Sequence, residues 1–202
     1  MRKKRLVYFL FFTVLLIGFL ATLSFFIPGF TQTKFPPISK VQPFEFENQD
    51  GKTTTEADIK GKVVAVNFFF TTCKSICPRM NNNLKPIYDD LKNEKDFMIL
   101  SHTSDPQRDS AAVLKHYADS MKIDTKKWIF LTGRKDSLYS AARFIYKIDD
   151  PNNFVENIDD DFLHTQFVAL VNKKGEVVHI YDGIKPSEMK QMETRIKELL
   201  QE

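Results

Sequence analysis

A long uninterrupted run of apolar residues opens the hydrophobic pattern of this chain. No charged residue occurs from Leu6 to Phe30, and a helix of this length is able to cross a hydrocarbon core about 30 Å thick. Four basic residues at positions 2–5 precede the run, which predicts that residues 1–5 stay in the cytoplasm. We therefore predict a single-pass transmembrane anchor over residues 6–30. A cleaved signal peptide is the alternative, because "ATLS" offers small residues, but the run is longer than a usual signal core.

The next segment, residues 31–43, is polar and rich in proline. This composition predicts a short, stiff tether with little helix or strand. A regular alternation of apolar and polar positions begins at Phe44. We therefore predict that residues 44–202 form one folded domain, which lies on the other side of the membrane from residues 1–5.

Strand patterns and helix patterns alternate within this domain. Residues 44–55 alternate about a Gln-Asp-Gly turn, which predicts a hairpin, and the apolar run at residues 62–70 predicts a strand buried on both faces. Further strands are predicted at residues 96–102, 128–132, 166–172 and 176–182, and helices at residues 81–94, 110–122, 136–148 and in a C-terminal segment with Met189, Met192, Ile196 and Leu199 on one face. This order predicts an α/β domain with a central sheet covered by helices on both faces.

The charge balance does not alter the predicted fold, but it argues against nucleic acid as a partner. The chain has 29 basic and 26 acidic residues, and four of the basic residues precede the apolar run. The remainder is therefore close to neutral. A near-neutral domain lacks the basic patch that nucleic-acid binding requires, so we expect no nucleic-acid partner.

The stretch "FFFTTCKSICPRM" contains both cysteines of the chain, Cys73 and Cys77. They follow the predicted central strand, at the edge where open α/β sheets place their ligand sites. If Pro78 lies in the first turn of the next helix, both cysteines are near the helix N-terminus, where backbone N–H groups and the helix dipole favour the thiolate.

Three chemistries suit such a pair. It can form a reversible disulfide, bind a soft metal ion, or form a structural disulfide in an oxidising compartment. The structural disulfide is disfavoured because closing so short a loop removes little chain entropy.

A metal would need further ligands, and the candidates are the four histidines. His116 falls in a charged helix and His179 in a terminal strand, so we expect both to be solvated or packed. His102 ends a predicted strand and could approach the same edge of the sheet. His164 follows the acidic loop "NIDDDF" and precedes another strand, where a loop is able to reach toward the cysteines.

Several segments together resemble the Sco/SenC family of copper-binding, thioredoxin-like cytochrome c oxidase assembly proteins. They are "GKVVAVNFFFTTCKSICPRMNNNL", "ILSHTSDPQRDSAAVLKHYADSM", "WIFLTG" and "FLHTQFVALVNKKGEVVHIYDG", in this order. The resemblance implies a thioredoxin-like fold that binds one copper ion, as Cu(I) or Cu(II), through Cys73, Cys77 and His164. Two thiolates and an imidazole also form a soft site of the kind that copper prefers.

The chain departs from the family pattern at two places. Many members have Pro-Asp after the first cysteine, whereas this chain has Lys74 and Ser75. Leu163 stands where an acidic residue often precedes the histidine, so an extra oxygen ligand for Cu(II) would have to come from the acidic residues 159–161, unless these form a solvated loop.

The segment "SDPQRD" is expected to be mainly architectural. Asp105 before a proline favours a turn, and Asp109 or Ser110 is a suitable helix N-cap. Arg108 could hold a nearby carboxylate or an acidic partner surface.

The resemblance implies a copper chaperone anchored in the inner membrane, with its soluble domain on the periplasmic side. Its expected partners are the copper-binding subunit of cytochrome c oxidase or another cuproprotein, and a periplasmic thiol reductant. The alternative is a thiol-disulfide oxidoreductase in which Cys73 attacks and Cys77 resolves the mixed disulfide. A peroxidase is disfavoured, because Cys77 lies too close to Cys73 to match the usual resolving cysteine.

Overall fold

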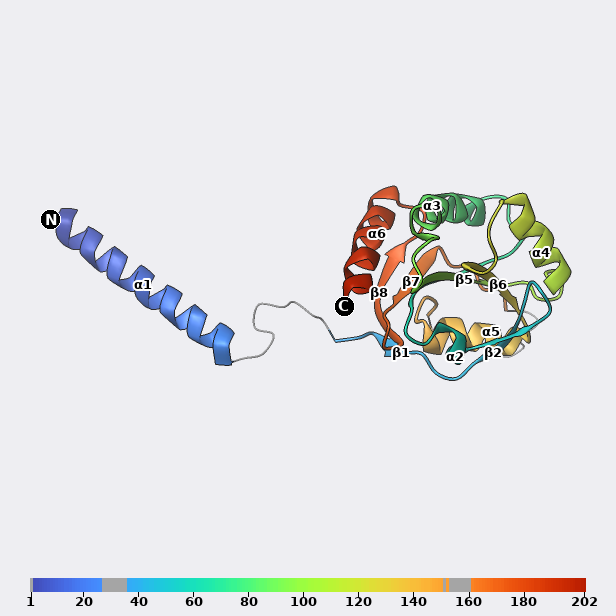
Figure 1. Ribbon diagram of the computed structural model, residues 1–202, viewed down its shortest axis with the longest axis horizontal. Coiled ribbons are helices and arrows are strands. Elements are labelled where there is room, and N and C mark those ends of the chain that lie inside the picture. Colours follow the sequence, from blue (N-terminus) through green and yellow to red (C-terminus); the bar gives the residue numbers. More distant parts are fainter. Residues whose placement is uncertain (1, 27–35, 151, 153–160) are drawn as a thin grey trace. The chain divides into compact units, whose positions relative to one another are not determined.

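The computed structural model describes residues 2–26, 36–150, 152 and 161–202. The chain divides into two compact units, Met1–Pro36 and Pro37–Glu202. The first contains helix α1 (Arg2–Phe26), shown in blue in Figure 1. In the described part of the chain, α1 is the one helix long and apolar enough to cross a membrane, over Lys4–Phe25, although a signal sequence would meet the same criteria. Residues 27–30 of the predicted span lie outside the described residues.

An eight-stranded sheet organises the second unit (Figure 1). Its strands are β1 (Ser39–Lys40), β2 (Glu45–Asn48), β3 (Thr53–Thr55), β4 (Val63–Phe69), β5 (Phe97–Thr103), β6 (Trp128–Thr132), β7 (Phe167–Val171) and β8 (Glu176–Asp182). They lie in the order β1-β8-β7-β4-β5-β6-β2-β3. Strands β4, β5 and β6 are parallel, and the other neighbours are antiparallel. Both hairpins expected from the sequence, β2–β3 and β7–β8, are present.

Helices cover both faces of this sheet, as the sequence predicts. They are α2 (Glu56–Ile59), α3 (Ile76–Leu91), α4 (Ala111–Ser120), α5 (Lys135–Ser140), the π-helix η1 (Ala141–Ile145) and α6 (Pro186–Gln201). Helices α3, α4 and α6 pack on one face, and α2, α5 and η1 pack on the other (Figure 1). The predicted α/β class is confirmed.

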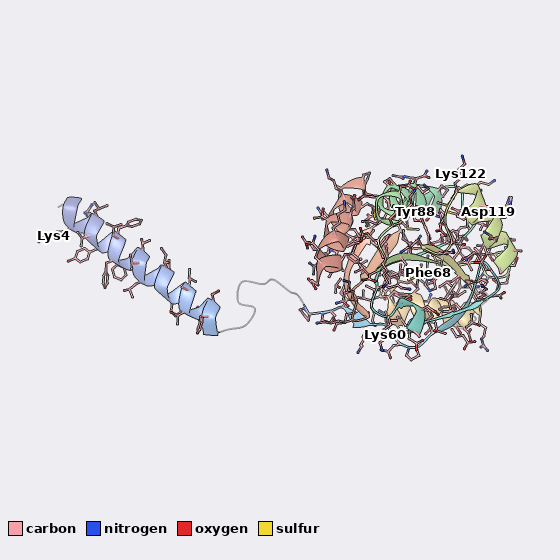
Figure 2. The ribbon with its side chains drawn as sticks, in the orientation of Figure 1. Lys4, Lys60, Phe68, Tyr88, Asp119 and Lys122 are labelled. Atoms are coloured by element: carbon pink, nitrogen blue, oxygen red, sulfur yellow. The ribbon has the colours of Figure 1, made fainter. Side chains whose placement is uncertain are left out.

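Strand β4 is the centre of the sheet, and all seven of its residues are buried. Its side chains alternate between the two cores: Phe69 faces α3 and α4, whereas Phe68 faces the α5 side, deep in the domain (Figure 2). Because β4 and β5 are parallel, with Phe69 opposite Thr103, their carboxyl ends meet at the same edge of the sheet. This edge carries the candidate site.

Three elements differ from the sequence-based expectation. The first is the short helix α2, which follows β3 where no helix is predicted. Strand β1 lies inside the predicted tether, where Ser39 pairs with Val177 at the free edge of β8. The helix predicted at residues 136–148 is α-helical only as far as Ser140 and continues as the π-helix η1. Strand β1 has no local sequence signal, because it depends on pairing with a distant strand.

Candidate metal centre

Both cysteines lie where β4 leads into α3. Cys77 is the second residue of α3 and is buried, whereas Cys73 lies in the preceding loop and is half-buried; both are free thiols. Pro78 stands in the first helical turn, as predicted. The Cys77 N–H donates to Cys73 Sγ at 3.4 Å, whereas the N-cap residue Ser75 makes no side-chain cap bond. The Cys73 sulfur therefore accepts a hydrogen bond from one of the N–H groups that have no partner within the first turn of a helix.

The two thiols have opposite proton affinities. Burial alone would raise the pKa of Cys73, but hydrogen bonds with the Cys77 side chain and the backbone N–H groups of residues 75–77 outweigh burial and lower it. Burial raises the pKa of Cys77 to about 12, and the neighbouring Cys73 adds to this effect. Cys73 is therefore the more acidic thiol of the pair, and Cys77 keeps its proton at neutral pH.

The third predicted ligand, His164, lies on the same cavity as the cysteines. This cavity has a volume of about 250 Å³, and Cys73, Cys77 and His164 are all part of its wall. His164 belongs to the segment that enters β7, a neighbour of β4 in the sheet. The topology thus brings together three side chains that are distant in the sequence.

The His164 ring is exposed and packs against aromatic side chains. Its centroid lies 4.5 Å from that of Phe162 and 5.6 Å from that of Phe70. In the parts of the chain that the structure describes, no three His, Cys, Asp or Glu side chains are grouped closely enough to hold a metal ion. Cys73, Cys77 and His164 thus line one cavity but are not close enough together to bind a metal ion in this arrangement, in which the imidazole contacts aromatic rings.

His102 does not approach the cysteines. It is fully buried on β5, with its ring stacked on Phe68 at 4.7 Å, on the α5 side of the sheet. Among the described residues, neither ring nitrogen has a hydrogen-bond partner of normal geometry, although the Asn67 backbone lies close to the ring. Burial lowers the pKa of His102 to about 3. His102 lies opposite Phe68 in the parallel pairing of β4 with β5, so both side chains face the α5 side. Phe69, the next residue along β4, faces the side of α3, because successive residues of a strand point to opposite faces of the sheet.

The residues that depart from the family pattern fall into two groups. Lys74 is exposed on the cavity wall. Leu163, in contrast, is buried with only 2% of its surface exposed, so it anchors the segment that carries His164.

The acidic residues before His164 supply no free carboxylate in the described structure. Asp161 is buried and pairs with Arg143 at 2.7 Å, whereas Asp159 and Asp160 lie outside the described residues. Arg108 forms an ion pair with Asp105 at 3.3 Å, which confirms the expectation that Arg108 holds a nearby carboxylate.

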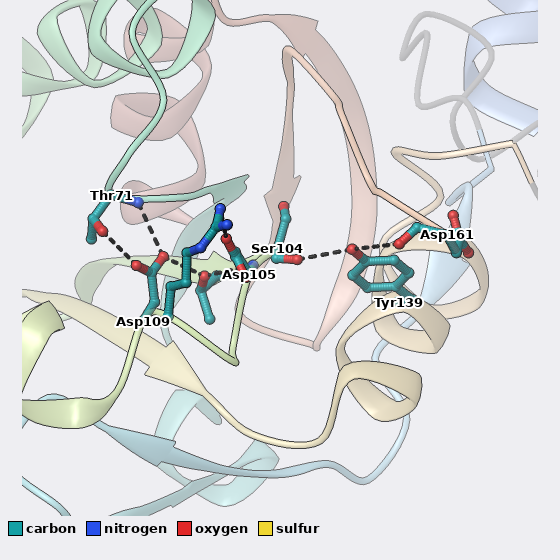
Figure 3. Close-up of polar contacts among 8 residues, drawn as sticks. Thr71, Ser104, Asp105, Asp109, Tyr139 and Asp161 are labelled. Carbon is teal, nitrogen blue, oxygen red and sulfur yellow. Dashed lines mark hydrogen bonds and ion pairs between the residues drawn. The ribbon is translucent and has the colours of Figure 1, made fainter. Parts of the chain in front are cut away.

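Asp109 has a role that the sequence did not indicate. Its buried carboxylate accepts hydrogen bonds from the Thr71 N–H at 3.0 Å, the Thr71 hydroxyl and the Thr103 hydroxyl at 2.6 Å (Figure 3). Ser110 is the N-cap of α4 instead, and its Oγ accepts from the Val113 N–H. Asp109 thus fixes the start of the cysteine loop. No local pattern reveals this, because its partner at position 71 is distant in the chain.

The sheet order, the helix layers and the dithiol at the start of α3 define a thioredoxin-like domain with a Cys-x-x-x-Cys site. Within that class the chain belongs to the SCO1/SenC family, whose model matches residues 33–201. It is 32% identical over 160 residues to the SCO1 protein homolog of Bacillus subtilis (strain 168), and the matched region covers 77% of this chain and 80% of that protein.

Solved structures agree with this assignment. The structure of BsSco, described as a member of the Sco family of cytochrome c oxidase assembly proteins with a disulfide switch, matches with a TM-score of 0.69 at 29% identity, over 84% of this chain and 98% of that one. Arabidopsis thaliana ScoI, solved with copper bound, matches with a TM-score of 0.64 at 25% identity, over 81% of this chain and 100% of that one.

Proposed function

We propose that this protein is a membrane-tethered copper chaperone that binds one copper ion through Cys73, Cys77 and His164. It would deliver the ion to the binuclear copper centre of cytochrome c oxidase or to another cuproprotein. The observation that carries the proposal is that these three side chains line one cavity. The family match and the copper-bound structure of Arabidopsis thaliana ScoI support copper as the bound ion.

The donor set suits copper better than zinc. Two thiolates and one imidazole are soft enough for three-coordinate Cu(I), and a further donor would accommodate Cu(II). Zinc usually takes four ligands, and the described cavity wall offers no fourth His, Cys, Asp or Glu. To complete the site, His164 must turn away from Phe162 and Phe70 toward the sulfurs, which its exposure allows.

The difference between the two thiols suggests an order of events. Cys73 is the more acidic thiol and would meet Cu(I) first. Cys77 would lose its proton when copper binds, so binding releases a proton and the apparent affinity rises with pH. Transfer would run in reverse by ligand exchange, with the exposed His164 as the first ligand to leave.

The proposed location follows from α1 and the residues before it. The basic positions 2–5 would stay in the cytoplasm, and the copper-binding domain would face the periplasm. A tether raises the effective concentration of a membrane-bound recipient. An oxidising compartment would join Cys73 to Cys77, so the proposal also requires a periplasmic thiol reductant.

Competition with a coloured Cu(I) chelator tests the ligand set on the reduced full-length chain in detergent. We expect the parent to bind one Cu(I). Cys73→Ala and Cys77→Ala should each abolish tight binding, and His164→Ala should weaken it by about tenfold or more, which is on the order of 1.4 kcal/mol.

His116→Ala is the matched control, because His116 is exposed on α4 and is not part of the cavity wall. It should leave the affinity unchanged. One-to-one tight binding that persists in both single cysteine variants would contradict the assignment.

A thiol-disulfide oxidoreductase is the second candidate, and the asymmetry of the cysteines favours it specifically. A half-buried acidic thiol beside a buried thiol that keeps its proton is the arrangement of an attacking and a resolving cysteine. If this is the activity, Cys77→Ser should trap a mixed disulfide on Cys73 with a model thiol substrate, and His164→Ala should leave the trapping rate unchanged. Weak copper binding by the parent together with efficient trapping would favour this function over the chaperone.

A further inference from the structure

One buried hydroxyl group links the segment that carries His164 to the turn after β5, which in turn contacts the end of β4. Tyr139 lies on α5 with 1% of its surface exposed. Its hydroxyl donates to the Ser104 carbonyl at 2.8 Å (Figure 3) and also accepts from the Leu163 N–H at 3.1 Å. The Asp161 carbonyl lies 3.5 Å from the same hydroxyl. One group therefore contacts both the residue directly after β5 and the residue directly before His164.

The Ser104 side of this contact leads to the cysteines. The Ser104 N–H donates to the Phe69 carbonyl at 2.7 Å, at the last residue of β4. Two residues later, Thr71 is held by Asp109, which also binds Thr103 beside Ser104. The cysteine loop is thus fixed to the same turn that receives the Tyr139 hydrogen bond.

The His164 side is attached by additional groups from α5, η1 and the segment after them. The buried Arg143 bridges Asp161 and Asp149 at 2.7 Å each, and its guanidinium lies 5.6 Å from the Tyr139 ring centroid. Beyond the histidine, the Thr165 hydroxyl donates to the Ile148 carbonyl at 2.8 Å. The backbone is therefore anchored on both sides of an exposed imidazole.

We propose that the Tyr139 hydroxyl positions His164 for copper binding. The hydroxyl holds the backbone before His164 at a fixed distance from the turn to which the cysteine loop is attached. The inference rests on the proposed function, since it concerns the same three ligands. A residue that sets this distance makes the imidazole reach the sulfurs with little loss of entropy on binding. Tyr139 makes no contact with copper in this role and acts only through the backbone of residues 163–164.

Tyr139→Phe isolates the hydroxyl, because the ring remains to fill the core. The variant leaves the Leu163 N–H and the Ser104 carbonyl without this partner. Tyr146→Phe is the matched control: Tyr146 is also fully buried in the same core, but its hydroxyl has no hydrogen-bond partner in the described structure. The two variants therefore remove the same atom from comparable surroundings.

Two measurements on the full-length chain in detergent test the role. The first uses the reduced, copper-free protein, in which Tyr139→Phe should speed amide hydrogen exchange in peptides that contain residues 161–164, whereas Tyr146→Phe should not. The second is Cu(I) affinity by chelator competition. Tyr139→Phe should weaken this affinity by about three- to tenfold, the range expected when the buried hydrogen bond to the Leu163 N–H no longer holds the His164 segment.

A double-mutant cycle with His164→Ala separates positioning from a general loss of stability. If Tyr139 acts through His164, its substitution should have no further effect on copper affinity once the imidazole is absent. An equal effect of Tyr139→Phe in both backgrounds would overturn the inference, as would unchanged affinity or unchanged exchange in the single variant.

The cycle also separates this inference from the proposal on which it rests. If His164→Ala binds copper as tightly as the parent, the ligand set itself fails and the positioning role fails with it. If His164→Ala binds weakly but Tyr139→Phe binds normally, the ligand set stands and only the role of Tyr139 is lost.

Discussion

At the scale of single residues, Cys73 and Cys77 show how position decides the chemistry of two identical side chains. The sulfur of Cys73 receives the first N–H groups of α3, which stabilise a negative charge. The sulfur of Cys77 lies in the core, where a charge would lose its hydration. A helix start and a buried helix face, only four residues apart, produce this difference.

This asymmetry predicts selective alkylation. At pH 7.5 iodoacetamide should modify Cys73 about tenfold or more faster than Cys77, because the thiolate is the reactive form. As pH rises, the Cys73 rate should level off below the usual thiol range, whereas the Cys77 rate should increase until the pH approaches 12. Mass spectrometry of the labelled peptides measures both rates. Equal rates near neutral pH would contradict the prediction.

At the scale of elements, the loop between β4 and α3 depends on a residue of another connection. Asp109, just before α4, accepts the backbone and side-chain hydrogen bonds of Thr71. The parallel pairing of β4 with β5 makes this possible, because both connections begin at the same edge of the sheet. The geometry of the cysteine loop is therefore a property of two loops together.

Asp109→Asn tests this dependence. The amide has one acceptor oxygen where the carboxylate had two, and in either orientation its NH₂ group would face one of the two Thr71 donors. We therefore expect a loss of about 1–3 kcal/mol in the free energy of unfolding. Urea denaturation measures the change. Asp119→Asn is the control, because Asp119 lies at the surface (Figure 2) and its carboxylate forms an exposed ion pair with Lys115. The effect of this control on the free energy of unfolding should stay within about 0.5 kcal/mol. Equal stabilities of the two variants would count against the role of Asp109.

At the scale of the whole molecule, the chain combines an apolar helix with a domain whose site lies at a sheet edge. Each part has a hydrophobic pattern that suits its own surroundings: α1 is apolar on all sides, whereas α6 is apolar on one face only. The proposed chaperone needs both parts, because the helix would keep the dithiol site near a membrane-bound recipient.

Retention of α1 in the mature protein is the prediction at this scale. Membranes of cells that express the chain should contain a protein whose intact mass includes the apolar run, and alkaline carbonate should fail to extract it, as is typical of a transmembrane helix. Replacement of the four basic residues at positions 2–5 by glutamine should weaken the preferred orientation. A mature mass that begins after the apolar run would establish the signal peptide instead.

Local periodicity was enough to predict most of the fold. The buried run of β4, the amphipathic face of α6 and the turn of the β7–β8 hairpin, where Gly175 has a positive φ of 74°, are properties of neighbouring residues. The short β1 strand, the one-turn helix α2 and the π-helical turn η1 were missed. Strand β1 pairs with a strand distant in the sequence, whereas η1 keeps the helical periodicity of α5 and differs only in bonds such as that from the Tyr146 N–H to the Ala141 carbonyl.

The sequence by itself determined the order of the elements, the apolar helix and the dithiol at the start of a helix, since each depends on residues close together in the chain. Only the tertiary structure decided which distant groups share the site. It placed His164 on the cavity of the cysteines and His102 on the opposite face. It also joined the two ligand-bearing segments through Tyr139 and Asp109. The physical reason is that strand pairing and the alternation of side chains across the sheet set these distances, and a single sequence does not encode them locally.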